Sequence, residues 1–144
     1  LGVHAAPLDL SSTYPVPDPE AGTASYDAMA AGGAPVGSAI YARLYNPTVA
    51  RVEQAIAELE GAEACVAFAS GMAATTAVLL ATAMDGAHVV AVRPMYGGTD
   101  HLLESGMLPI QVSFVAPHEV ASAIRPDTGL VFIETPANPT LALL

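Results

Sequence analysis

Apolar residues recur from position 47 onward with a spacing that matches one face of a helix. Four of them are separated by three, four and three residues: Val49, Val52, Ile56 and Leu59. Asn46 is a favourable N-cap residue, and Pro47 suits the first helical position. Gly61 suits the position just after a helix. The pattern predicts a helix that begins at Pro47 and ends before Gly61.

After this helix, short apolar runs alternate with segments of helical character. The predicted strands are 64–69, 88–92, 110–115 and 130–133, and the predicted helices are 73–84, 98–105 and 118–124. The strands are apolar on both faces, as in a parallel sheet covered by helices. This succession predicts an open α/β sheet with right-handed crossovers. Ligands of such sheets bind beyond the carboxyl ends of the strands, so we expect a site in the loops that follow them.

The first forty or so residues show neither the helical spacing nor the apolar runs of strands. Prolines at positions 7, 15, 17, 19 and 35 and the pair Gly32-Gly33 argue against a long helix or a central strand. Because so long an irregular segment is unusual inside a compact domain, we expect it to wrap a second subunit. The chain is therefore divided into an N-terminal arm, 1–46, and the first part of an α/β domain, 47–144.

Charge and composition narrow the classes of partner. The chain has 14 acidic residues against 4 basic ones, all arginines, for a formal net charge of -10, and it contains no lysine. This field repels phosphate backbones and anionic membranes, so neither nucleic acid nor a membrane is expected as a partner. The charge-free run 64–84 is long enough to span a bilayer but breaks at Ser70-Gly71, which favours a strand, a turn and a helix.

The cysteine and histidine residues indicate neither a disulfide nor a metal site. The single cysteine, Cys65, excludes an intramolecular disulfide and fits a reducing, cytoplasmic location. The four histidines lack the spacing of metal ligands, so no metal is predicted.

Three loops that follow predicted strands carry residues suited to a planar or anionic ligand. Ser70-Gly71-Met72 opens a helix, where free backbone N–H groups can bind a phosphate. Tyr96 precedes two glycines, which leave room for its ring to lie against a planar ligand. Glu134 and Asn138 lie in a loop with two prolines, and the Asn138 amide can donate to a ligand oxygen. Each loop taken alone also fits an ordinary turn.

A fourth element, Tyr41 to Thr48, precedes the first predicted helix. If the segment is extended, Tyr41 and Arg43 point to the same side. A phenol beside a guanidinium suits a doubly charged phosphate. The alternative is a surface arginine next to a packing tyrosine.

Taken in order, these motifs resemble those of the cystathionine γ-synthase, cystathionine γ-lyase and methionine γ-lyase family of pyridoxal-phosphate enzymes. The family pattern contains Tyr-x-Arg-x-x-Asn-Pro-Thr, Ser-Gly-Met, Tyr-Gly-Gly and Glu-(Ser/Thr)-Pro-x-Asn-Pro, and all four occur here between Ser11 and the end. The resemblance implies pyridoxal 5'-phosphate as cofactor. It also implies an aspartate-aminotransferase-like (fold type I) large domain with a mostly parallel sheet, preceded by an extended N-terminal arm.

The resemblance also implies roles for individual residues. Gly71 and Met72 would bind the cofactor phosphate through backbone N–H groups. Tyr41 and Arg43 would reach the same phosphate from a neighbouring subunit, so that a homodimer or homotetramer would share its active sites. Tyr96 would stack on the pyridine ring and help to move protons.

Two further residues complete the implied site. Asn138 would contact the ring hydroxyl oxygen, and Glu134 would lie nearby as a supporting carboxylate. Tyr96 and Tyr41 are the catalytic candidates.

The implied activity is γ-elimination or γ-replacement on a small amino-acid substrate, either a sulfur amino acid or an activated homoserine. An aminotransferase or β-lyase of the same fold is one alternative, and a non-catalytic fragment or interaction domain is another. The chain starts without methionine and stops within the apolar run 141–144, so we expect it to be a fragment. Because it lacks the Schiff-base lysine, we expect the 144 residues alone to be inactive.

Overall fold

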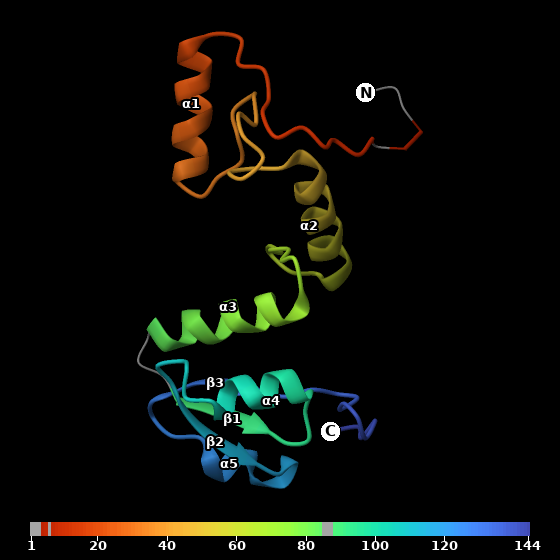
Figure 1. The fold of residues 1–144 in the computed structure, drawn as a ribbon, viewed down its shortest axis with the longest axis vertical. Coiled ribbons are helices and arrows are strands. Elements are labelled where there is room, and N and C mark those ends of the chain that lie inside the picture. The colour runs from red at the N-terminus through yellow and green to blue at the C-terminus, as the bar shows by residue number, and fades with distance from the viewer. Residues whose placement is uncertain (1–3, 6, 85–87) are drawn as a thin grey trace. The chain divides into compact units, whose positions relative to one another are not determined.

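The computed structural model describes residues 4–5, 7–84 and 88–144, and the chain divides into two compact units (Figure 1). The first unit is Leu1–Ala67 and the second is Phe68–Leu144. The first contains two helices, and the second contains a parallel sheet with its helices. Residues 1–3 and 6 of the predicted arm lie outside the described residues.

The arm contains a helix where the sequence analysis expected irregular structure. Helix α1, Pro19–Ala30, has 12 residues and is capped by Asp18, whose carboxylate accepts the Ala21 N–H at 2.7 Å. The prediction of an arm without a long helix was therefore wrong. The reason is that the last of the early prolines occupies the first turn, where no intrahelical N–H is required, and the next proline is Pro35. The alanine-rich stretch between them is free to form a helix.

Helix α2, Pro47–Glu60, has the predicted bounds. Its N-cap Asn46 accepts the N–H groups of Thr48 at 2.9 Å and Val49 at 3.1 Å. Gly61 ends the helix with a left-handed φ of 63°. Four apolar residues on its predicted face remain between 41% and 82% exposed: Val49, Val52, Ile56 and Leu59. Within the described residues of the first unit, this face is therefore not covered.

The cap of α2 gives a test of stability. We expect Asn46→Ala to lower the free energy of unfolding by about 1 kcal/mol, because two N–H groups lose their acceptor. Urea unfolding of the intact protein would measure it. Gln54→Ala is the matched control on the same helix, since Gln54 is exposed and bonds only the Glu58 side chain. An equal loss for both variants would contradict the capping role.

The segment 64–69 was predicted as a strand but has no strand structure. The N–H of Ala67 donates to the Glu53 carboxylate at 2.8 Å instead of to a neighbouring strand. Val66 and Phe68 are 68% and 45% exposed. A strand forms only where another backbone pairs with it, and among the described residues none pairs with this segment.

The second unit alternates helices and strands as predicted. Its elements are α3 Gly71–Met84, β1 His88–Val92, α4 Gly97–Glu104, β2 Gln111–Val115, the 3-10 turn η1 Pro117–Glu119, α5 Val120–Ala123 and β3 Thr128–Phe132. β1 has the predicted bounds, β2 begins one residue later than predicted, and β3 begins two residues earlier and ends one residue earlier. α5 is short because its first turn is η1. The sequence therefore located the three strands and three helices of this unit, with η1 as the unpredicted first turn of α5.

The sheet is parallel with the order β2-β1-β3, so the first strand is the central one. Every residue of β1 is buried. Leu79 of α3 and Leu103 of α4 pack with Val89 and Ala91 of β1 in the hydrophobic core, together with Met95. The predicted open parallel α/β sheet is confirmed for the described strands. Because β1 and β3 are neighbours, the loops that follow them share one edge of the sheet.

His88 is a buried polar residue that connects all three strands. Its Nδ1 lies 2.8 Å from the Thr128 hydroxyl on β3, and its Nε2 lies 2.8 Å from the Ser113 hydroxyl on β2. Burial lowers the pKa of His88, and the nearby Arg125 lowers it further, against the opposite effect of Asp127. A neutral imidazole has one donor and one acceptor nitrogen and so satisfies both hydroxyls. His88 therefore links the three strands from within the sheet.

Within the described ranges, no helix is both long and apolar enough to cross a membrane. In the same ranges, no cluster of histidine, cysteine and acidic side chains is arranged to hold a metal ion.

Candidate functional site

The loops after β1 and β3 are joined through Glu134. The Tyr96 N–H, in the loop after β1, donates to Glu134 Oε2 at 2.9 Å. The Asn138 N–H, four residues after Glu134, donates to Oε1 at 2.9 Å. The structure therefore brings Tyr96, Glu134 and the Asn138 backbone together at one edge of the sheet.

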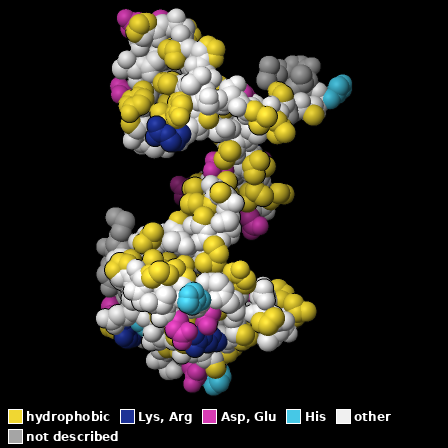
Figure 2. Space-filling view, in the orientation of Figure 1, with side chains coloured by type: hydrophobic (Ala, Val, Ile, Leu, Met, Phe, Trp, Pro, Cys, Tyr) yellow, Lys and Arg dark blue, Asp and Glu magenta, His cyan; other side chains and the backbone are white. Residues whose placement is uncertain are grey.

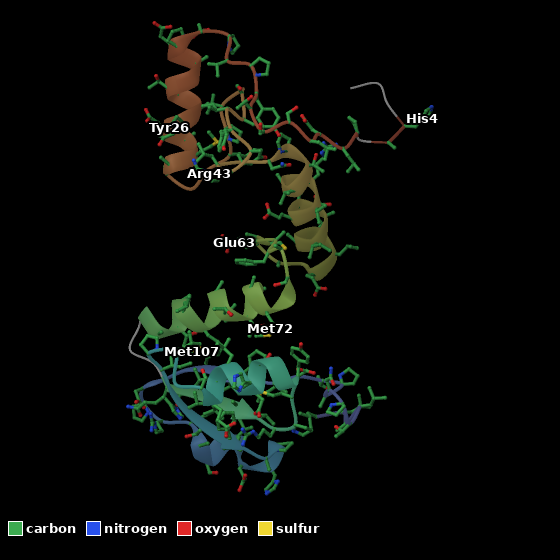
Figure 3. The ribbon with its side chains drawn as sticks, viewed as in Figure 1. His4, Tyr26, Arg43, Glu63, Met72 and Met107 are labelled. Carbon is green, nitrogen blue, oxygen red and sulfur yellow. The ribbon has the colours of Figure 1, made fainter. Side chains whose placement is uncertain are left out.

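The N-terminus of α3 lies at the same place. An open pocket of about 420 Å³ is lined by Ser70, Gly71, Met72, Thr75, Tyr96, Thr99, Phe132 and Glu134. It contains four of the predicted site residues, namely Gly71, Met72, Tyr96 and Glu134. The Asn138 side chain is not among the residues that line it. Figure 3 shows Met72 at the start of α3.

Free backbone donors mark the beginning of α3. Ser70 accepts two N–H groups, that of Ala73 on its hydroxyl and that of Ala74 on its carbonyl, each at 3.1 Å. The N–H groups of Gly71 and Met72 have no acceptor among the described residues. These two N–H groups lie at the positive end of the helix dipole, beside an open pocket. A helix N-terminus of this kind is a common binding site for a phosphate.

The Tyr96 ring lies directly against Gly98. A Cβ atom added at Gly98 would lie 2.5 Å from Tyr96 Cε1 and 3.1 Å from Cζ. Glycine at this position therefore allows the ring to fold back over the start of α4. The ring remains 46% exposed, which leaves part of it free to contact a planar ligand.

Three lining residues were not identified from the sequence. Thr99 is 3% exposed, and its hydroxyl donates to Met72 Sδ at 3.6 Å, which links α4 to α3. Thr75 lies one helical turn after Gly71, and Phe132 is the last residue of β3. The helical repeat could have identified Thr75, and the rule that ligands bind at strand ends could have identified Phe132. No sequence signal identified Thr99.

Arg93 lies directly after β1 and pairs with two acidic residues of α4. It forms an ion pair with Asp100 at 2.6 Å and a longer one with Glu104 at 3.5 Å, and its guanidinium lies 3.8 Å from the Phe114 ring centroid. The hydrogen bond to Asp100 raises the pKa of Arg93. The two acidic residues lie one helical turn apart on α4, and both pair with Arg93. Figure 2 shows acidic and basic side chains side by side on this unit.

Tyr41 and Arg43 lie in the first unit and do not form the extended segment that was expected. Residues 42–44 form a turn, and the Leu44 N–H donates to the Tyr41 carbonyl at 2.9 Å. The turn still places the two side chains together, because the Arg43 guanidinium lies 5.1 Å from the Tyr41 ring centroid. The expected pairing is confirmed, but the expected backbone conformation is wrong.

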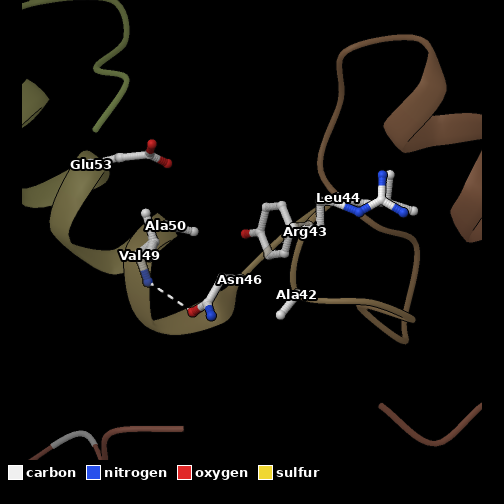
Figure 4. Close-up of a pocket in the computed structure, with 8 residues that line it drawn as sticks. Ala42, Arg43, Leu44, Asn46, Val49, Ala50 and Glu53 are labelled. Carbon is white, nitrogen blue, oxygen red and sulfur yellow. Dashed lines mark hydrogen bonds between the residues drawn. The ribbon is translucent and has the colours of Figure 1, made fainter. Parts of the chain in front are cut away.

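Arg43 differs from the other three arginines in its contacts. Arg93 and Arg125 pair with carboxylates, and Arg51 donates to two backbone carbonyls. Arg43 has no hydrogen-bond acceptor among the described residues and stacks only on Tyr41. It lines a small pocket of about 230 Å³ with Asn46 and Glu53, from which its guanidinium points away (Figure 4). Its N–H donors are therefore available to an anion.

Comparisons with known proteins agree with this geometry. The crystal structure of metB from Corynebacterium glutamicum matches 99% of the chain with a TM-score of 0.81 and 31% identity, and the match covers 35% of that protein. The fold is that of fold type I pyridoxal-phosphate enzymes, and this chain corresponds to 35% of the matched protein. A family profile described as "Cys/Met metabolism PLP-dependent enzyme" matches residues 1–144, and the chain belongs to this family.

Two curated relatives of the chain have different activities. An L-methionine gamma-lyase of Streptomyces avermitilis is 61% identical over 145 residues, which is 99% of this chain and 35% of that protein. An O-acetyl-L-homoserine sulfhydrylase of Corynebacterium glutamicum is 44% identical over 111 residues, 73% of this chain and 25% of that protein. The chain spans about a third of the length of the first of these.

The residues of the second unit fit the cofactor of the family, pyridoxal phosphate. Two free N–H groups at the start of α3 suit its phosphate, and the half-exposed Tyr96 ring suits its pyridine ring. The pocket is open on the side where these groups lie.

Proposed function

We propose that the whole protein to which this chain belongs is a pyridoxal-phosphate-dependent γ-lyase that acts on L-methionine or a closely related sulfur amino acid. The observation that carries the proposal is the pocket where α3 begins, which joins a phosphate-binding helix terminus to Tyr96 and Glu134. The 61% identity to a methionine γ-lyase favours elimination over replacement.

The residues of the second unit would divide the work as follows. Gly71 and Met72 N–H groups bind the phosphate, and Tyr96 holds the pyridine ring by stacking and moves a proton at its phenol oxygen. The Asn138 side chain donates to the ring hydroxyl oxygen. Bound pyridoxal phosphate supplies the electron sink that allows protons to leave the amino-acid substrate.

Two residues of the first unit would complete the phosphate site in a homodimer or homotetramer. Tyr41 and Arg43 of one subunit reach the phosphate of its neighbour. The free guanidinium of Arg43 supports this role, because a bidentate donor without an internal partner is suited to a phosphate. The lysine that holds the cofactor has to come from outside these 144 residues, since the chain contains none.

The activity is tested by product analysis with the intact protein, pyridoxal phosphate and L-methionine. Elimination consumes water and is expected to yield methanethiol, ammonia and 2-oxobutanoate in equal amounts. O-Acetyl-L-homoserine with sulfide is the comparison substrate pair, because replacement there yields homocysteine without ammonia. Faster turnover of that pair than of methionine would contradict the proposal and assign a sulfhydrylase.

The 144-residue chain alone serves as a second comparison. We expect it to show no turnover and, after borohydride reduction, to carry no pyridoxyl group on any side chain, since no lysine is present and the α-amino group is its one primary amine. A pyridoxyl group located on a side chain by peptide mapping would contradict that expectation.

A further inference from the structure

The carboxylate of Glu134 is engaged by backbone N–H groups on both of its oxygens. Oε2 accepts the Tyr96 N–H and Oε1 accepts the Asn138 N–H, each at 2.9 Å. One bond crosses from the loop after β3 to the loop after β1, and the other closes the turn that contains Asn138. A charged acceptor makes each of these bonds stronger than one between neutral groups.

Apart from the bond to Glu134, the backbone of Tyr96 is held through its carbonyl group. It is the N-cap residue of α4, and its carbonyl accepts the N–H groups of Thr99 and Asp100, each at 3.0 Å. The Tyr96 side chain makes no capping hydrogen bond to this helix. Glu134 therefore supplies the contact on the Tyr96 N–H, and its negative charge lies at the positive end of the helix dipole.

The direction of the Tyr96 ring depends on this backbone position. The ring folds over Gly98 with little spare room, because a Cβ there would approach Cε1 to 2.5 Å. A shift of the Tyr96 backbone would therefore move the ring relative to the pocket. The same carboxylate fixes the backbone from which the Asn138 amide projects.

We propose that Glu134 is a positioning residue, whose carboxylate locks the loops after β1 and β3 together so that Tyr96 and Asn138 are held in place toward the cofactor. This inference rests on the proposed function. It assigns to Glu134 an action through two backbone N–H groups, in place of direct contact with the cofactor.

Hydrogen exchange tests the lock without reference to catalysis. Glu134→Gln keeps the size of the side chain, but its amide nitrogen cannot accept an N–H. We expect peptides covering residues 93–99 and 134–139 of the cofactor-free intact protein to exchange about tenfold faster at the affected amides. The matched control is Glu119→Gln, because Glu119 also accepts a backbone N–H, that of Ala116 at 2.8 Å, outside the pocket. Unchanged exchange in Glu134→Gln would overturn the proposal.

The loaded protein gives a second readout, the visible circular dichroism of bound pyridoxal phosphate. We expect a weaker signal and a lower kcat at nearly unchanged KM in Glu134→Gln, with Glu134→Asp intermediate because it keeps the charge. In the double variant with Tyr96→Phe, the loss of kcat should be smaller than the product of the two single losses. A loss equal to that product would show that Glu134 acts independently of Tyr96 and would overturn the proposal.

These experiments separate the inference from the proposed function. If methionine is not cleaved but exchange still accelerates in Glu134→Gln, the proposed function fails and the loop lock stands. If methionine is cleaved and exchange and dichroism are unchanged, the lock fails alone. Should Glu134→Gln not fold, Glu134→Asp is used for the same comparison, and unchanged exchange and dichroism in it then overturn the lock.

Discussion

Replacing Arg43 with alanine is expected to lower the affinity of the intact protein for pyridoxal phosphate by about 100-fold. The reason is the loss of two charge-assisted hydrogen bonds to a doubly charged phosphate, each contributing about 1.5 kcal/mol at an exposed position, or about 3 kcal/mol together. Arg43 is exposed and stacks on Tyr41, with its donors uncommitted in the part of the chain that the structure describes. Titration of the cofactor-free protein with pyridoxal phosphate, followed by absorbance, gives the dissociation constant.

Two variants control for the loss of positive charge. Arg43→Lys keeps the charge but not the planar fork, so we expect an affinity between those of the wild type and Arg43→Ala. Arg125→Ala removes an arginine that pairs with Asp127 on the surface, and its affinity should match the wild type. Equal affinities in Arg43→Ala and the wild type would contradict the phosphate role.

Mixing subunits tests whether Arg43 acts on the neighbouring subunit. Arg43→Ala subunits mixed with Tyr96→Ala subunits would form some sites in which both residues are native. At a pyridoxal phosphate concentration that loads the wild type but not Arg43→Ala, random pairing should then restore about one quarter of the wild-type activity, because half the dimers are mixed and one of two sites in each is intact. No recovery would mean that both residues serve the same subunit.

Replacing His88 with alanine is expected to lower the free energy of unfolding by about 3–5 kcal/mol. The change opens a cavity at the central strand and leaves the half-buried Ser113 and Thr128 hydroxyls without the ring nitrogens that bind them. Urea unfolding of the intact protein measures the loss. His118→Ala is the matched control, because His118 is exposed in the turn after β2 and should change stability little. Similar losses for both would contradict a structural role for His88.

The same histidine predicts a dependence of stability on pH. The pKa of His88 is lowered in the folded protein, whereas in the unfolded protein it is about 6.5. As the pH falls, His88 therefore takes up a proton in the unfolded state first. The unfolded state then binds more protons, so the free energy of unfolding decreases below about pH 6.5 by up to 1.4 kcal/mol per unit. His88→Gln should remove this part of the slope between pH 7.5 and 5.5. A slope identical to the wild type would contradict the assignment.

The parts of the structure that could be predicted from the sequence are those set by local signals. Asn46, Pro47 and Gly61 fixed both ends of α2, because caps act within one turn of the chain. The buried β1 was placed exactly, since a run of apolar residues between polar ones has few alternatives. In α1 the prolines were counted as helix breakers, although Pro19 is at the one position where a helix accepts it.

Features that depend on distant parts of the chain could not be predicted. The segment 64–69 has the composition of a strand, but pairing requires a second backbone, which composition does not reveal. The ion pairs of Arg93 with Asp100 and Glu104 depend on how α4 turns back onto the strand end. The bond from Glu134 to the Tyr96 N–H joins residues 38 apart, and the motifs gave no indication of it.

The strand order has a consequence for how the protein is made. β1 occupies the centre of the sheet, yet both of its partner strands follow it in the chain. The hydrogen bond between His88 and Thr128 joins residues that are 40 positions apart, so it forms only after Thr128 has been made. At a synthesis rate of 5–20 residues per second, the ribosome needs about 2–8 seconds to add that stretch. Until β2 has been made, the fully buried strand of the sheet has only α3 before it and α4 after it, and its β3 side stays unpaired for the whole interval. Nascent chains should therefore be most prone to bind chaperones between the synthesis of β1 and that of β3.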